Sequence, residues 1–233
     1  MRTADHPNLP QVMLPGQAAS VPGPLDMSNM YLAHYGFRRD LGYLLTAVGR
    51  IDLGDRRRLG ALREHLMWVL FVLHYHHTAE DEGIWPRLRE RAPEAVGTID
   101  ALEAEHAACD RWIGESAEAF QAFGAAPSEQ GRDRLMTALR ALADTLGAHL
   151  AHEETEGIPL IMAHITARED KKIHKAITKQ YGLRKLIKLL GWMTYELPPH
   201  VEDQLRRTSP KAMVLLSSLA RRRYERLGRY LWG

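Results

Sequence analysis

The chain has 233 residues, of which 45% are hydrophobic and 26% are charged, the composition of an ordinary soluble protein with one main core and an appendage. Cys109 is the only cysteine, which excludes an intrachain disulfide. Residues 1–26 lack the apolar core of a signal peptide, and no apolar run approaches the ~18 residues that span a bilayer. We therefore expect a cytoplasmic protein without a transmembrane segment.

The formal net charge of +2 hides an uneven distribution. From Arg168 to the end there are 16 Lys and Arg against 6 Asp and Glu, which leaves 15 against 23 for the rest of the chain. A basic tail can contact nucleic acid or an anionic membrane surface. Amphipathic helices that pack on an acidic body and expose their basic faces explain the same charges, so there is no strong case for nucleic acid.

The first elements follow from prolines and from helical periodicity. Residues 1–26 contain five prolines and no sustained apolar period, which predicts a disordered or extended N-terminal arm. Apolar residues and His34 then recur every three or four positions, which predicts a helix over about 28–49.

Two further stripes share one pattern. Each steps by 4, 3, 4, 3 and 4 residues, begins with four apolar residues and ends in a histidine and a glutamate. The first stripe comprises Leu62, Leu66, Val69, Leu73, His76 and Glu80. The second comprises Leu135, Leu139, Leu142, Leu146, His149 and Glu153, with Ser128 as a candidate N-cap of its helix. The two helices carry one motif at an offset of 73 residues.

The repeat extends to the other two helices of the body. A helix over about 99–120 places His106 on its apolar stripe, 72 residues after His34. Two similar helical hairpins fold most simply into an all-α, antiparallel four-helix bundle, which we assign to residues 27–165. Helical patterns at about 168–180, 183–195, 200–207 and 210–231 form a basic C-terminal extension, residues 166–233, that we expect to pack on the bundle.

The polar ends of the stripes predict a metal site. Residues four apart on a helix are neighbours, so His76 with Glu80, and His149 with Glu153, can reach one ion from one face. His34 and His106 add an imidazole from each of the other helices. Two facing sets of nitrogen and oxygen donors are typical of two metal ions bridged by carboxylates.

The repeat also chooses among the other polar residues of the motif. His74, His77 and His152 have no histidine at the corresponding position of the other half, so His77 is given a supporting role beside the ligands. Asp81 and Glu154 directly follow the ligand glutamates and are candidates to hold a ligand ring, with solvent exposure as the alternative.

Three residues near the histidines have open roles. Asp110, four residues after His106, is a further candidate ligand, with ring support or solvation as the alternatives. Tyr35, which neighbours His34, is expected to support the site or to pack. Glu103 forms a Glu-x-x-His spacing with His106, but no second copy accompanies it. Cys109 is interpreted as a small core residue.

These residues resemble a known family, the hemerythrin-like or HHE cation-binding proteins, and in particular members of actinobacterial type. The similarity covers roughly residues 27 to 162. It rests on His34, on the ordered histidine–glutamate pairs with their following acids, on His106 after Glu105, and on the Ile84-Trp85-Pro86 and Pro159-Leu160 segments.

The resemblance implies two iron ions (Fe2+/Fe3+), carboxylate- and oxo-bridged, with an open position for dioxygen, peroxide or nitric oxide. The chain departs from the oxygen carriers of the family in two ways: Asp110 stands where they have a second histidine, and the spacing from His149 to Glu153 is shorter than theirs. More carboxylate favours higher oxidation states, so activation or consumption of the oxidant is expected over reversible carriage.

Two functions remain open from the sequence. One is a diiron oxidoreductase, catalase-like or an oxygenase, that consumes dioxygen or hydrogen peroxide, with a small organic substrate as an option. The alternative is a non-enzymatic oxygen, nitric oxide or iron sensor, or an iron-binding module, that signals through its C-terminal helices. Ligand types alone leave zinc and manganese open, and the oligomeric state is not predicted.

Overall fold

The computed structural model describes residues 8–233, which form helices joined by loops and contain no β-strand. The helices of the body are α1 (Ser28–Arg50), α2 (Arg56–Gly83), α3 (Trp85–Arg91), η1 (Pro93–Ala95), α4 (Val96–Ala125), α5 (Glu129–His152), η2 (Glu153–Gly157) and α6 (Ile158–His164). The C-terminal helices are α7 (Ala167–Met193), α8 (Pro199–Thr208) and α9 (Lys211–Trp232). The predicted all-α class is confirmed.

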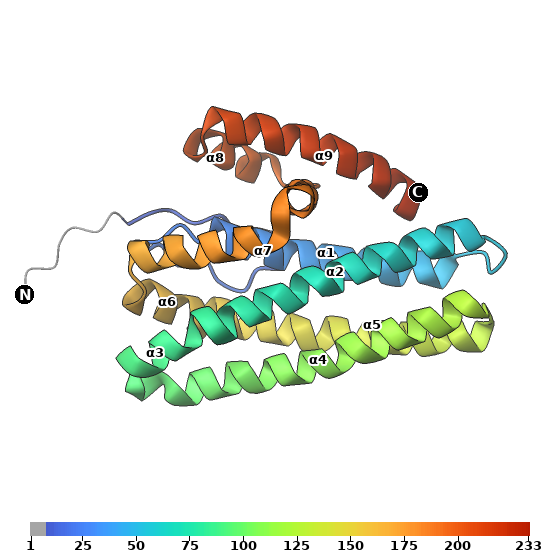
Figure 1. Ribbon diagram of the computed structural model, residues 1–233, viewed down its shortest axis with the longest axis horizontal. Coiled ribbons are helices and arrows are strands. Elements are labelled where there is room, and N and C mark those ends of the chain that lie inside the picture. Colours follow the sequence, from blue (N-terminus) through green and yellow to red (C-terminus); the bar gives the residue numbers. More distant parts are fainter. Residues whose placement is uncertain (1–7) are drawn as a thin grey trace, which may run out of the picture.

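Four long helices, α1, α2, α4 and α5, form the predicted antiparallel bundle (Figure 1). Each packs against two others in the order α1, α2, α4, α5 and back to α1. Both repeated stripes face the interior: Leu62 and Leu66 of α2, like Leu135 and Leu139 of α5, are completely buried. The apolar residues of each stripe therefore form the core, and the histidine and glutamate that end the stripe lie on the same interior face of the helix.

Side chains mark the starts of several helices. Asp55 accepts a hydrogen bond from the Arg58 backbone at the start of α2, and Ser128 accepts one from Gly131 at the start of α5, as predicted. Thr166 and Glu169 form a capping box for α7. These caps satisfy N–H groups that a helix start leaves without an internal partner.

The C-terminal helices pack on α1 and α2, on the opposite side from α4 and α5 (Figure 1). Gly182 divides α7 with φ 65° and ψ 164°, a backbone conformation that residues other than glycine rarely adopt. The second half of α7 then turns toward α9, and the Gly191 position lies so close to the Ala220 carbonyl that a Cβ atom would stand 2.6 Å away. None of the helices in residues 8–233 combines the length and apolar character that a membrane crossing requires.

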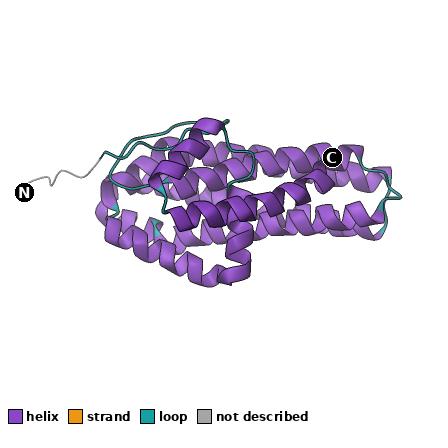
Figure 2. Ribbon diagram, turned by 90° about the horizontal axis from the view of Figure 1, so that it is seen from above, coloured by secondary structure: helices purple, strands orange, loops and turns teal. Residues whose placement is uncertain are grey.

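Residues 8–26 of the predicted arm lie against the bundle (Figure 2). Its one β-bridge among the described residues joins Leu9 and Gly23, and Val12 and Leu14 are buried. The Gln11 amide donates to the Leu25 carbonyl and accepts from the Met27 backbone. The segment 8–26 is therefore extended and packed, and the part of the predicted arm at 1–7 lies outside the described residues.

A buried polar network joins the C-terminal helices to the bundle. The Asp40 carboxylate of α1 accepts hydrogen bonds from Arg39, from His65 of α2, from the Trp192 indole and from the Tyr224 hydroxyl. Burial alone would raise the pKa of Asp40, but the charge of Arg39 and the bond from His65 hold it well below its usual range. One ionised, fully buried carboxylate thus connects α1, α2, α7 and α9.

Replacement of Asp40 tests this connection. Asp40→Ala leaves the buried Arg39 guanidinium without its counter-charge and removes the acceptor of three further donors, so we expect the free energy of unfolding to fall by about 3–5 kcal/mol. The matched control is Asp133→Ala, at an exposed position of α5. Urea unfolding curves measure both variants, and equal stabilities would contradict the role of Asp40.

Candidate metal centre

Histidine and glutamate side chains of four helices converge at one level of the bundle. Within each of three groups, one donor atom per residue lies within 4.8 Å of the others. The groups are His34, His76 and Glu153; His77, His106 and His149; and Glu80, His149 and Glu153. Because the third group shares residues with the other two, the seven side chains form one continuous cluster.

Distances inside the cluster suit metal ligands. The Nε2 atom of His34 lies 3.2 Å from Nε2 of His76 and 3.1 Å from Oε2 of Glu153. Nε2 of His106 lies 3.4 Å from Oε2 of Glu80. Two ligands that stand about 2.1 Å from one ion at right angles are about 3 Å apart. The donors are therefore spaced as they would be around ions.

The atoms of the cluster also lack other partners. Among the described residues, buried atoms without a hydrogen bond include both carboxylate oxygens of Glu80 and of Glu153, both ring nitrogens of His77, and Nε2 of His106 and His149. A buried polar group without a partner costs about 1–3 kcal/mol, and a charged group costs more. The same donors are ligands that divalent metal ions accept, so the residues fit a bound metal. This buried cluster can hold metal.

Two acids that follow the ligand glutamates hold histidine rings across the bundle. Asp81 lies 2.7 Å from Nδ1 of His106, and Glu154 lies 2.9 Å from Nδ1 of His34. Each half of the repeat therefore supplies the carboxylate that orients a histidine of the other half. Such contacts fix the ring and direct its second nitrogen, Nε2, toward the metal position. The supporting role predicted for Asp81 and Glu154 agrees with these distances.

A third acid has the same role and was missed in the sequence. Glu105 lies 3.0 Å from Nδ1 of His149 and 2.9 Å from Nδ1 of His152. The corresponding residue in the first half is Ala33, so the repeat gave no reason to select it. Its position immediately before a candidate ligand was the one available signal.

The segment around Glu153 departs from α-helical geometry. Residues Glu153–Gly157 form a π-helical turn, in which the Ile158 backbone N–H bonds to the Glu153 carbonyl. Pro159 has no N–H to continue an α-helix at this point. Both Glu153 and Glu154 are completely buried, whereas the corresponding Asp81 side chain is 42% exposed. The wider turn thus coincides with two successive glutamates that both face the interior.

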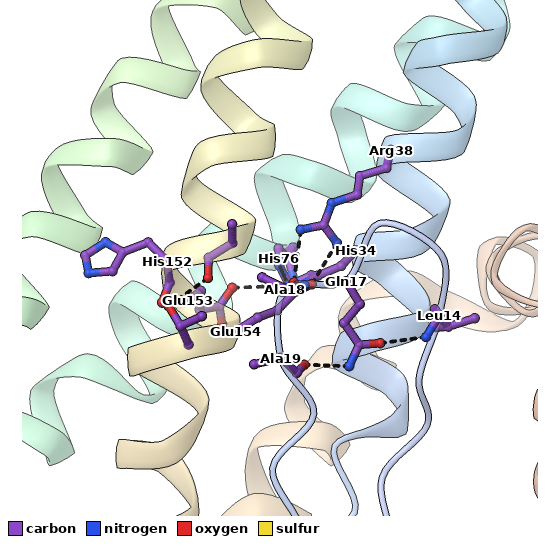
Figure 3. Close-up of polar contacts among 12 residues, drawn as sticks. Leu14, Gln17, Ala18, Ala19, His34, Arg38, His76, His152, Glu153 and Glu154 are labelled. Carbon is purple, nitrogen blue, oxygen red and sulfur yellow. Dashed lines mark hydrogen bonds and ion pairs between the residues drawn. The ribbon is translucent and has the colours of Figure 1, made fainter.

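The N-terminal arm completes the surroundings of Glu154 (Figure 3). This carboxylate accepts hydrogen bonds from Arg38 and, at 2.7 Å, from the Ala18 backbone N–H. Gln17 holds the loop in place through the Leu14 backbone N–H and the Ala19 carbonyl. The arm therefore closes the site at the side of His34, a role that its proline content did not predict.

The structure brings together the six residues that the repeat selected, but it separates two other candidates from them. Asp110 is exposed and belongs to none of the three donor groups. Tyr35 donates its hydroxyl to the Glu196 carbonyl in the C-terminal region. Burial raises the pKa of the Cys109 thiol to about 12, so it remains protonated, in agreement with a core role.

His77 lies among the ligand candidates rather than around them. Its ring stacks on His106 at 4.0 Å and lies 5.2 Å from His149. The repeat gave no reason to select His77 as a ligand, because its counterpart is Leu150. A second stripe on the same helix, Leu66, Leu70, Leu73, His77 and Glu80, also steps by three and four and was the overlooked signal. His77 stands about 100° from His76, so one ring faces α1 and the other faces α4.

Charges in the cluster favour protons in the absence of a metal ion. Burial opposes the charged form of His34, but Glu153 and Glu154 raise its pKa to about 9. Burial and the charge of Glu153 raise the pKa of Glu80 to about 8. Burial lowers the pKa of His76 and of His77 well below the usual range, so both rings are neutral donors.

A comparison with protein families matches the hemerythrin HHE cation binding domain over residues 26–161. The matched range includes every residue of the cluster and ends before the C-terminal helices. Neither the search of curated proteins nor that of solved structures returned a match.

Metal affinity should rise with pH. Protons on His34 and Glu80 must leave before these groups can bind an ion, so binding releases protons and weakens as the pH falls. We expect the apparent Kd for Mn2+, measured by calorimetry, to decrease from about pH 6 to about pH 9. The heat of Mn2+ binding, measured in buffers that differ in ionisation enthalpy, gives the number of protons released. An affinity that is constant over this range, without proton release, would contradict the arrangement.

Proposed function

Because the chain belongs to the hemerythrin HHE cation-binding domain family, we propose that it holds two iron ions between its four long helices and consumes a small oxidant, dioxygen or hydrogen peroxide. The observation that carries the proposal is the set of buried, unpartnered donor atoms on Glu80, Glu153 and the inward-facing histidines. Imidazole and carboxylate together suit iron, whereas a zinc site of structural type is closed by four ligands.

The donor groups suggest how the ligands are shared. His34, His76 and Glu153 surround the first position, and His77, His106 and His149 surround the second. Glu80 and Glu153 share the third donor group with His149, and Glu153 also belongs to the first group. The Oε2 atom of Glu80 lies 3.4 Å from Nε2 of His106, a member of the second group. Glu80 and Glu153 are therefore the carboxylates that would bridge the two ions.

The bound iron would supply Lewis acidity and electrons, and the protein tunes both through its own residues. Asp81, Glu105 and Glu154 each contact the Nδ1 atom of a ligand histidine and so raise the basicity of its Nε2. A more basic ligand stabilises the higher oxidation state of a metal. Three such acids in one centre favour loss of electrons to the oxidant.

Asp110 is not among the ligands that we propose. Its carboxylate is exposed, so it does not add negative charge to the centre, and His77 supplies the second histidine that it seemed to replace. The preference for oxidant consumption now rests on the three orienting acids. Because the centre is rich in histidine, binding of the oxidant without its consumption remains the alternative function.

One observation favours that alternative, a sensor of oxygen, nitric oxide or iron. Helices α7 and α9 pack directly on α1 and α2, which carry His34 and His76. Movement of these helices on ligand binding would reach the C-terminal region without a separate domain. In this function the oxidant binds but is not consumed.

Iron analysis with spectroscopy separates the functions. We expect about two iron ions per chain after reconstitution, a near-ultraviolet charge-transfer absorption after exposure to oxygen, and loss of added peroxide followed by oxygen-electrode recordings. Spectral change without peroxide or oxygen loss would select the sensor. Failure to bind iron, with tight binding of zinc or manganese instead, would overturn both.

Variants of neighbouring histidines assign the ligands. His149→Ala should remove one iron, and His77→Ala should lower occupancy of the same position because its ring shares that donor group. His74→Ala is the matched control on the same helix, since His74 is exposed. Full iron content in His77→Ala would return this residue to a supporting role.

A further inference from the structure

A cavity of about 540 Å3 lies between the bundle and the C-terminal helices. Residues of α1, α2 and α6 line one side, and residues of α7, α8 and α9 line the other. His76 and Glu80, both members of the metal cluster, belong to its lining. Its volume is in the range of about 300–1,000 Å3 that is typical of sites for small organic molecules.

The wall of the cavity is mainly aliphatic. Representative residues are Met30, Ile173, Ile177, Leu189, Leu190 and Met193. Tyr75 and Tyr181 are the aromatic residues in the lining. Branched and thioether side chains adapt to a flexible chain, while a flat aromatic ligand is usually met by aromatic faces. The wall therefore fits an alkyl or acyl chain.

The bend in α7 forms this wall. Tyr181 and Leu186 both line the cavity although Gly182 turns the helix between them. The first half of α7 contributes Ile173 and Ile177, and the second half contributes Leu189 and Leu190. The bend thus lets one helix enclose the cavity from two directions.

Charged groups of the lining differ in how far they are neutralised. Asp170 pairs with His174 at 3.2 Å, and Asp26 accepts a hydrogen bond from the Ser28 backbone at the start of α1. On α8 and α9, Arg206 and Arg221 share Glu202, which is close to Arg221 but 3.9 Å from Arg206. The Arg206 side chain is 64% exposed and so remains available to an anion at the edge of the cavity.

We propose that this cavity binds an aliphatic carboxylate of the fatty-acid type, with its chain between the bundle and α7 and its carboxylate at Arg206. The proposal deepens the proposed function, because a chain in the cavity would lie next to His76 and Glu80. Binding itself does not require that function. The ligand class follows from the wall and from the one weakly paired guanidinium.

Calorimetric titration of the full-length, metal-loaded protein with dodecanoate, below its micelle-forming concentration, tests the proposal. We expect saturable binding by the unaltered chain and at least about tenfold weaker binding by Ile177→Trp, whose side chain fills the cavity. Leu183→Trp is the matched control, because Leu183 is an exposed residue of α7 outside the lining. If circular dichroism shows that Ile177→Trp is misfolded, Ile173→Trp is used in its place.

The head group has its own test. Arg206→Gln should weaken dodecanoate but not dodecanol, and equal binding of the two compounds by the unaltered chain would overturn the assignment of the carboxylate. Absence of saturable dodecanoate binding, or equal binding by both tryptophan variants, would overturn the cavity as the site. If the chain binds dodecanoate but takes up no iron on reconstitution, the cavity assignment stands and the diiron function is refuted.

Discussion

The structure depends on one constraint: imidazole and carboxylate groups are buried together between four helices, where a cation can satisfy them. Glu80 and Glu153 are almost completely buried, and the ion pairs described for them are all with histidines of the same cluster, namely His34, His76 and His106. Two isolated carboxylates in such a place would be strongly destabilising, and protonation of Glu80 and His34 relieves this only in part. Bound metal would satisfy the donors together and so would stabilise the helix arrangement that presents them.

The parts of the chain outside the bundle serve the same site. The N-terminal arm donates a backbone N–H to Glu154, which in turn holds His34 (Figure 3). The C-terminal helices are joined to α1 and α2 through Asp40, and they leave a cavity that reaches His76. The arm thus covers the cluster beside His34, and the cavity under the C-terminal helices borders it at His76 and Glu80.

The bundle and six residues of the cluster could be predicted because both depend on local periodicity and on an internal repeat. The repeat carries no information where the two halves differ, since His77 has Leu150 as its counterpart and Glu105 has Ala33. Asp110 was selected from spacing alone, yet its place on α4 is exposed. The contact of Ala18 with Glu154 joins segments that are 136 residues apart, which periodicity does not report.

The most direct test of the two-iron centre is the position of the metal itself. Crystals of the iron-loaded protein, measured on both sides of the iron absorption edge, should show two anomalous peaks between the helices. We expect one peak beside His34 and His76, the other beside His77, His106 and His149, and Glu80 between them. A single peak, or two peaks with His77 outside bonding distance of both, would contradict the account.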